Sequence, residues 1–191
     1  MFGSKHKSSF RLKGYDYRQD GLYFVTVCSA NFHSYFGEIR NERMILNSFG
    51  KIIQGEWLRT PFLRKYVKLH EFQIMPNHLH GIIEIHELPL PYTEIFSPYK
   101  LSPTHKNKFG GKISLNLFAI MRGFKGSAKT IINSIQNEFV FDWQVSFQDR
   151  IIRDDEEYKR IVRHIKENPK KWPRDPNNPQ SPTFKGVPSI Y

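Results

Sequence analysis

Two histidines one residue apart, His78 and His80, are the residues of this chain best suited to metal chemistry. They lie in the run 73–85, which otherwise has the apolar and β-branched composition of a buried strand. Strand side chains alternate between faces, so both imidazoles project from one side of a sheet while Leu79 projects from the other. Such a pair can bind a divalent metal. The alternative is two histidines hydrogen-bonded on a partly exposed sheet face.

The donor types favour an open metal site over a closed structural one. A structural zinc site takes four protein ligands and commonly uses thiolates. The single cysteine, Cys28, excludes a cysteine-rich zinc site and an intrachain disulfide, and it is expected to pack within a strand. An open site suits Mg²⁺ or Mn²⁺, which also take phosphate oxygens and water. Such a metal polarises a phosphodiester and stabilises the charge of in-line displacement.

The basic composition indicates a polyanionic partner. Lys plus Arg exceed Asp plus Glu by 29 − 18 = 11, and aromatic residues make up 15% of the chain. Cations interleaved with aromatic rings suit a nucleic acid with unpaired bases. The residues predicted to contact phosphates are Arg11, Lys13, Arg122, Lys125 and Lys129. The last three form one stripe on a predicted helix because they are three and four residues apart; the alternative is an ordinary solvated face.

The length of 191 residues suits a single folded domain with flanking segments. We expect a basic arm over 1–20, a domain over 21–172 and a proline-rich tail over 173–191 that lies on the surface or is disordered. A stretch at about 87–112 is rich in Pro, Ser, Thr, Lys and Gly, which predicts a long mobile insertion. The sequence contains no long apolar run or signal peptide, so a soluble cytoplasmic protein is expected.

The predicted elements follow a ferredoxin-like order. In chain order they are a strand at 21–28, a hairpin around 36–46, a helix from Asn47 or Ser48 to about Arg59, strands at 67–74 and 78–85, a helix from Ser114 to about Gln136, an extended segment at 141–153, and a helix from Asp154 to about Lys166 that stops at Asn168-Pro169. This is the split βαβ order of an α+β, RRM-like fold, with an antiparallel sheet and two helices on one face. The third helix could cross the other face, where the histidines point.

The last predicted helix carries two further polar candidates, His164 and Asn168. They are four residues apart, so they share a face, roughly 40° apart around the helix. The plain alternatives are a solvated histidine and an asparagine that caps the helix ahead of a proline. An apolar stripe that includes Tyr158 faces the core.

Five segments together resemble a known family. Pro-Asn-His-Leu-His-Gly at 76–81 is followed by Trp-Gln at 143–144, Asp-Arg-Ile-Ile-Arg at 149–153, Glu-Glu at 156–157 and Ile-Lys-Glu-Asn-Pro at 165–169. This set resembles the HUH single-strand DNA transposases. Within them it is most similar to the REP-associated tyrosine transposases, relatives of the smallest insertion-sequence transposases. The resemblance covers roughly residues 21–172.

The resemblance implies a mechanism and a partner. The matching residues His78, His80 and Asn168 would bind Mg²⁺ or Mn²⁺, with the last supplied by a C-terminal catalytic helix. In the family a tyrosine one turn before this third ligand attacks single-stranded DNA, forms a 5′-phosphotyrosine link and releases a 3′-hydroxyl. The substrates are typically hairpins from imperfect palindromes. A bacterial, nucleoid-associated protein is implied, either monomeric or a homodimer that exchanges the tyrosine helix.

One position departs from the family pattern. Members usually read Arg-Tyr-Ile before the Asn-Pro, whereas this chain reads Arg-His-Ile, so His164 occupies the position of the nucleophile. The chain is therefore either a transposase in which another residue attacks or a domesticated, cleavage-deficient DNA-binding protein. A third reading is that the histidine is a simple substitution of the tyrosine. Tyr158 is the nearest other tyrosine, but it lies roughly 120° away around the helix. His164 could itself attack phosphate or add a metal ligand.

Overall fold

The computed structural model describes residues 20–86, 116–184 and 186. The predicted arm up to residue 19 and the predicted insertion at 87–112 lie outside the described residues. The same is true of the phosphate contacts predicted for Arg11 and Lys13. Among the described residues, no helix is long and apolar enough to cross a membrane.

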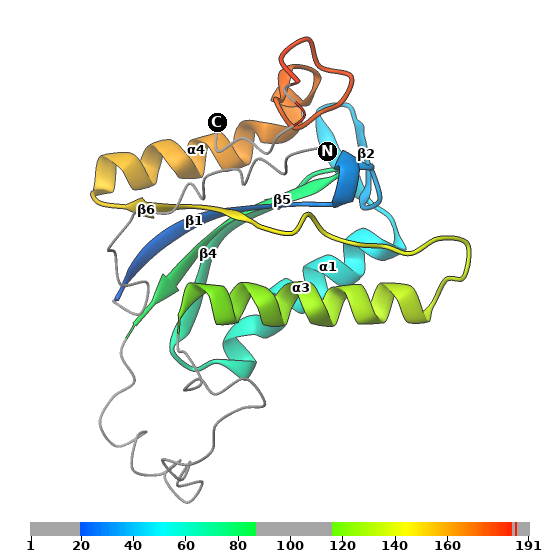
Figure 1. Ribbon diagram of the computed structural model, residues 1–191. Helices are drawn as coiled ribbons and strands as arrows, with labels where there is room; N and C mark the ends of the chain where they lie inside the picture. The colour runs from blue at the N-terminus through cyan, green and yellow to red at the C-terminus, as the bar shows by residue number, and fades with distance from the viewer. Residues whose placement is uncertain (1–19, 87–115, 185, 187–191) are drawn as a thin grey trace, which may run out of the picture.

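The described residues form a four-stranded antiparallel sheet in the order β4-β5-β1-β6 (Figure 1). The strands are β1 (Gly21–Cys28), β4 (Val67–Ile74), β5 (His78–Ile85) and β6 (Gln148–Ile152). β1 is central and pairs with both β5 and β6, although β6 follows it by about 120 residues in the sequence numbering. This strand order is that of the ferredoxin-like fold, so the predicted fold class is confirmed.

A separate hairpin, β2 (Gly37–Arg40) and β3 (Arg43–Leu46), follows β1. Its two-residue turn consists of Asn41 and Glu42, which have φ of 49° and 59°. Two successive positive φ values are typical of the tight turns that match the twist of paired strands. The predicted hairpin is therefore confirmed, with its turn at the polar residues between the two apolar runs.

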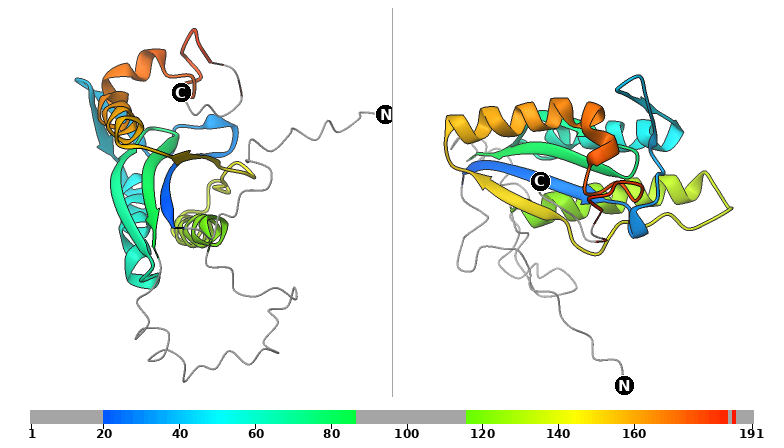
Figure 2. Two further views of the ribbon diagram at one scale, coloured as in Figure 1. Left: turned by 90° about the vertical axis from the view of Figure 1, so that its left-hand side faces the viewer. Right: turned by 90° about the horizontal axis from the view of Figure 1, so that it is seen from above.

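Helices cover both faces of the sheet (Figures 1 and 2). α1 (Ser48–Leu63) and α3 (Leu117–Ser134) lie on one face, and α4 (Asp155–Lys171) crosses the other, as predicted. A side chain before each helix accepts a hydrogen bond from its first turn. These capping residues are Asn47, Asn116 and Asp154.

Three helix ends differ from the sequence prediction. Asn116 caps α3 in place of the expected Ser114, because its side chain accepts from the Ala119 amide at 2.9 Å. α1 runs past Arg59 to Leu63, and α4 runs past Lys166 to Lys171. Each of these two helices includes a proline near its end, which the prediction took as a stop in the case of α4.

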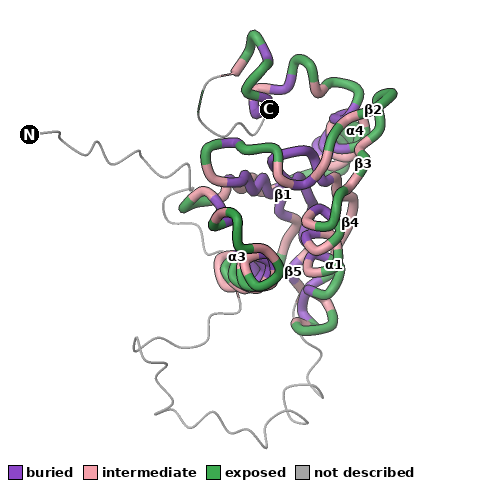
Figure 3. Tube along the Cα trace, turned by 90° about the vertical axis from the view of Figure 1, so that its right-hand side faces the viewer, coloured by how far each residue is buried: buried purple, intermediate pink, exposed green. Residues whose placement is uncertain are grey.

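The sheet separates two hydrophobic cores. The larger core lies between the sheet and the α1–α3 layer and includes Trp57 and Leu79. The smaller core, on the α4 side, contains Phe24, Ile82, Ile152, Ile161 and Ile165. Figure 3 shows buried residues along the strands and on the inner sides of the helices. β5 is thus covered on both faces at His78 and His80, so these polar side chains are removed from water.

Gly81 allows β5 to pass close beneath α1. A Cβ atom at this position would overlap the indole ring of Trp57. The residue before Gly81 is His80. The packing of Trp57 on Gly81 therefore fixes the distance between α1 and β5, the strand that carries the histidine pair. The glycine is required by this close approach and not by an unusual backbone angle.

The chain after α4 folds back over the end of the sheet (Figures 1 and 2). A short 3₁₀ helix, η2 (Trp172–Arg174), is followed by a segment to Phe184, whose ring packs edge-on against Phe32 at 5.2 Å between centroids. The buried polar residues of this segment are Asp175, Asn177, Asn178 and Ser181. The alternative of a disordered tail therefore does not hold for 173–184: these residues lie on the surface and pack against the folded domain through their buried polar side chains.

Candidate metal centre

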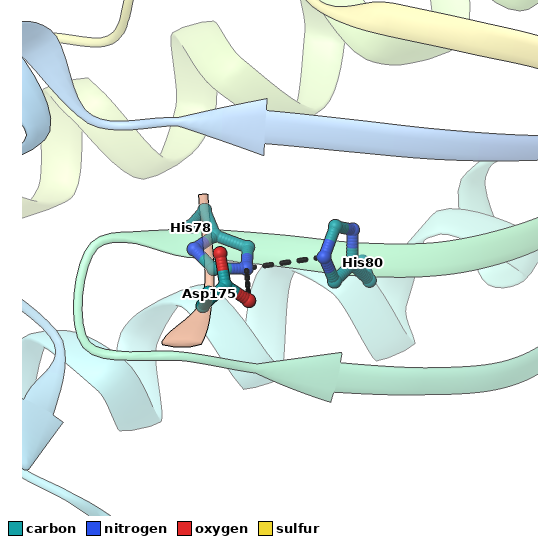
Figure 4. A group of neighbouring side chains, drawn as sticks. All are labelled: His78, His80 and Asp175. Carbon is teal, nitrogen blue, oxygen red and sulfur yellow. Dashed lines mark hydrogen bonds and ion pairs between the residues drawn. The ribbon is translucent and has the colours of Figure 1, made fainter. Parts of the chain in front are cut away.

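The two histidines of β5 lie side by side on the face that α4 covers (Figure 4). Their Nε2 atoms are 3.1 Å apart, and His78 and His80 are 0% and 1% exposed. Leu79 between them packs into the core on the opposite face, as the strand alternation predicts. The alternative of a partly exposed pair is excluded by this burial.

The hydrogen-bond network fixes the tautomer of His78. The Asn77 amide nitrogen donates to the carbonyls of Phe32 and Asn177, at 2.9 and 2.8 Å. Its oxygen must then face His78, and it accepts a hydrogen bond from Nδ1 at 2.8 Å. A neutral imidazole that carries its proton on Nδ1 has a lone pair on Nε2. His78 therefore presents a lone pair towards His80.

His80 meets a hydroxyl on the neighbouring strand. Thr26 is its cross-strand partner in β1, and Thr26 Oγ1 lies 2.8 Å from His80 Nδ1. When the hydroxyl accepts a proton from Nδ1, the Nε2 atom of His80 also has a free lone pair. A hydroxyl can donate or accept, so Thr26 permits the tautomer that a metal requires.

Both imidazoles are held in the neutral form. Burial lowers the pKa of His78 to about 3, and the neighbouring His164 acts in the same direction. Burial also lowers the pKa of His80 well below its ordinary value, with His78 and His164 adding to the shift and Asp175 opposing it. Metal binding requires neutral imidazole, so little proton competition is expected at neutral pH.

A carboxylate completes the cluster from the segment after α4. Asp175 Oδ2 lies 4.0 Å from His78 Nε2, and the ligand atoms of His78, His80 and Asp175 all lie within 4.8 Å of one another. Asp175 is 4% exposed, and its oxygens accept from the Asn168 side chain at 2.9 Å and the Asn177 amide at 2.7 Å. Both of these hydrogen-bond donors are neutral. A buried carboxylate that faces a nitrogen lone pair is destabilised unless a cation lies between them.

Asn168 offers a fourth donor atom. It is 1% exposed and lies inside α4, so it is not the helix cap that the plain alternative required. Its nitrogen donates to Asp175, but its oxygen has no hydrogen-bond partner among the described residues. Such a buried unpaired acceptor costs about 1–3 kcal/mol. The ligand atoms of His78, His80 and Asp175 could therefore hold a divalent cation, and the hydrogen bond to Asp175 places Asn168 next to them.

His164 lies beside this cluster, one helical turn before Asn168. Its ring centroid is 5.2 Å from that of His80 and 6.2 Å from that of Phe24. The side chain is half-buried, and burial lowers its pKa while Asp175 opposes the shift. The residue at the position of the family's nucleophile therefore lies next to the histidine pair, and its imidazole is neutral.

Tyr158 faces a different group. Its hydroxyl lies 3.1 Å from His70 Nδ1, and His70 Nε2 lies 2.7 Å from Glu84 Oε2. Glu84 is four residues beyond His80 on β5, which places it roughly 13 Å along the strand. The structure therefore directs Tyr158 away from the histidine pair, consistent with its predicted core position and against a role as substitute nucleophile.

The predicted basic stripe lies on α3, on the opposite face of the sheet from the histidines. Lys125 Nζ donates to the carbonyls of Gln144 and Val145 at 2.7 and 3.2 Å. Lys129 Nζ lies 2.7 Å from Asp142 Oδ2. Arg122 is exposed. Two members of the stripe thus bind groups of this chain, and DNA contact by the stripe stays a prediction.

Asp175 is the one member of the cluster that sequence reasoning missed. It lies among prolines and asparagines that are typical of a surface loop, and the sequence spacing to His78 is almost a hundred residues. Only the buried polar run that follows α4 brings it to the sheet.

A relative in Haemophilus influenzae shows the family of the chain. The two proteins are 38% identical over 174 residues, which cover 91% of this chain and 93% of the relative, an uncharacterized protein. The chain belongs to the family of this protein. No model of a described protein family matches the chain.

A solved structure shares the fold. The REP-associated tyrosine transposase bound to a REP hairpin matches 86% of this chain and 74% of its own, with a TM-score of 0.56 and 19% identity. The chain therefore has the fold of a REP-associated tyrosine transposase, and the resemblance drawn from the sequence is confirmed at that level. His78, His80 and Asp175 lie together on this fold.

Proposed function

We propose that this protein is a transposase-like protein that processes single-stranded DNA at a divalent metal centre. The observation that carries the proposal is the convergence of three buried ligand groups, His78, His80 and Asp175, on the face of the sheet that α4 covers. Asn168, which has an unpaired oxygen, is hydrogen-bonded to Asp175. The fold is that of a protein whose structure contains a REP hairpin, which supports a DNA hairpin as the partner. Such a protein would act at the bacterial nucleoid.

The residues that would hold the metal are His78, His80, Asp175 and Asn168. Two imidazoles favour Mn²⁺ over Mg²⁺, because nitrogen ligands suit transition metals while Mg²⁺ prefers oxygen. When bound, the metal supplies Lewis-acid polarisation of a phosphodiester. Thr26 and Asn77 support the site by holding the ring orientation and the tautomers of the two histidines.

His164 determines which kind of processing the chain performs. Its neutral ring can accept a proton or present a nitrogen lone pair to a phosphodiester beside the centre. The presence of a histidine in place of the family's tyrosine at position 164 favours a second function, in which the chain binds hairpin DNA without cleaving it. In that case an imidazole occupies the position where the family has a phenol, and the hydroxyl of Tyr158 is bonded to His70 instead.

A His164→Tyr substitution tests the proposal. The variant and the unaltered protein are incubated with Mn²⁺ and end-labelled hairpin oligonucleotides from the DNA that flanks the gene, and the products are separated on denaturing gels. We expect a covalent protein–DNA adduct with the variant. Adding His78→Ala should abolish the adduct, and thermal melts verify that each variant is folded.

The outcome separates the two functions. Cleavage by the unaltered protein would show that His164 supports the reaction without tyrosine. Binding without cleavage, unchanged by His78→Ala, would favour the domesticated form. If the tyrosine variant binds the hairpins but forms no adduct with any of them, the catalytic part of the proposal is wrong.

A further inference from the structure

A pocket of about 660 Å³ opens at the C-terminal end of α4. Its lining residues are Glu167, Lys170, Lys171, Pro173 and Arg174. The volume lies in the range of about 300–1,000 Å³ that is typical of small-ligand sites, so it accommodates a group the size of a nucleotide. None of these residues belongs to the set predicted from the sequence to contact phosphates.

We infer that this pocket binds a backbone phosphate of the single-stranded DNA, next to the phosphodiester that reaches the metal centre. The inference rests on the proposed function and adds the part of the substrate that the protein holds outside the centre.

The charges of the pocket favour an anion. Three of its side chains are cationic and one is acidic, and Lys170 and Lys171 are 69% and 57% exposed. Lys171 Nζ lies 2.6 Å from Glu167 Oε2, so the charge of Lys171 is paired within the pocket. Among the residues that the structure describes, the ion pair of Lys170 is a long one, with Glu42 at 3.8 Å.

Arg174 is the side chain best suited to a phosphate. It forms no ion pair with the described residues of the chain, and it lies in η2, beyond the end of α4. Lysines in the last turn of a helix also stabilise the helix dipole, so Lys170 and Lys171 alone would not indicate a ligand. The planar guanidinium of Arg174 offers parallel donors that match phosphate oxygens.

The pocket adjoins the candidate metal centre through the chain itself. Asn168 directly follows the lining residue Glu167, and Asp175 directly follows Arg174. His164 lies two helical turns before Lys171 on the same side of α4. An oligonucleotide phosphate in the pocket would therefore lie beside the half-buried His164 and the cluster behind it.

The test compares two charge-matched double variants. The pocket variant carries Arg174→Gln and Lys170→Gln, and the control variant carries Lys51→Gln and Arg59→Gln on the opposite, α1 side of the sheet. Binding of a fluorescein-labelled hairpin with a single-stranded 5′ extension is followed by anisotropy at several salt concentrations. Each phosphate contact on a single strand contributes a slope of about 0.7 to log K against log salt.

We expect the pocket variant to lower this slope by about 0.7, the contribution of one phosphate, and the control variant to leave it unchanged, relative to the unaltered protein. The rise in melting temperature with Mn²⁺ should be retained in both variants, because neither alters a proposed metal ligand. If both variants bind the oligonucleotide with the slope of the unaltered protein, the pocket assignment is overturned while the proposed function stands. If the unaltered protein binds no such oligonucleotide, both are overturned.

Discussion

Replacement of Asp175 by Asn gives two effects of opposite sign if Asp175 is a metal ligand. Without metal, the carboxylate is buried against the lone pair of His78 Nε2. An amide at this position removes that charge, and its NH₂ group can donate to the unpaired Asn168 oxygen once the Asn168 amide rotates. The metal-free variant should therefore be at least as stable as the unaltered protein.

With metal, the same variant loses stabilisation. At a metal concentration 100 times the dissociation constant, binding stabilises the folded protein by about 2.7 kcal/mol. For a chain of this size that corresponds to a rise in melting temperature of roughly 5–11 °C. Loss of a charged ligand that weakens affinity about 100-fold leaves about 0.4 kcal/mol at the same concentration, or roughly 1–2 °C.

Differential scanning calorimetry of EDTA-treated protein, with and without Mn²⁺, measures both effects. Asp142→Asn is the matched control, because Asp142 is a carboxylate 51% exposed that pairs with Lys129 on the far side of the sheet. It should preserve the metal-dependent rise. An Asp175→Asn variant that melts lower without metal, yet shows the full rise with Mn²⁺, would refute the assignment of Asp175 as a ligand.

Two further predictions concern the elements that hold the histidines. Thr26→Val removes the hydrogen bond to His80 Nδ1, so Mn²⁺ affinity measured by titration calorimetry should fall about 10–100-fold; unchanged affinity would mean that Thr26 does not orient the ring. Gly81→Ala should destabilise the protein by about 1–3 kcal/mol or more in urea unfolding, because the added methyl overlaps Trp57. Gly126→Ala, in open space on α3, should instead stabilise by about 0.5–1 kcal/mol, and equal effects of the two changes would contradict the packing argument.

The sheet and the histidine pair could be predicted from the sequence because their determinants are local. The run 67–85 has two apolar segments separated by a turn at residues 75–77, and the structure places β4 and β5 at the predicted bounds. The spacing of His78 and His80 alone fixes their common face. Asn168 was reached by resemblance to the family, and the structure brings it to the same cluster.

The end of α4 and the position of Asp175 could not be predicted, because both depend on tertiary packing. A proline normally ends a helix, yet Pro169 is buried within α4 and the helix continues for two residues. Asp175 is held by hydrogen bonds to Asn168 and Asn177, and the latter residue is itself held by Asn77. None of these contacts leaves a periodic pattern in the sequence.

The cluster draws on distant parts of the chain, which has a consequence for biosynthesis. β5 supplies its two imidazoles, and Asp175 follows His80 by 175 − 80 = 95 residues in the sequence. Translation proceeds from the N-terminus at about 5–20 residues per second, so the nitrogen donors exist seconds before the carboxylate does. A metal that requires all three groups can therefore be bound only after Asp175 has been synthesised and has packed against the sheet.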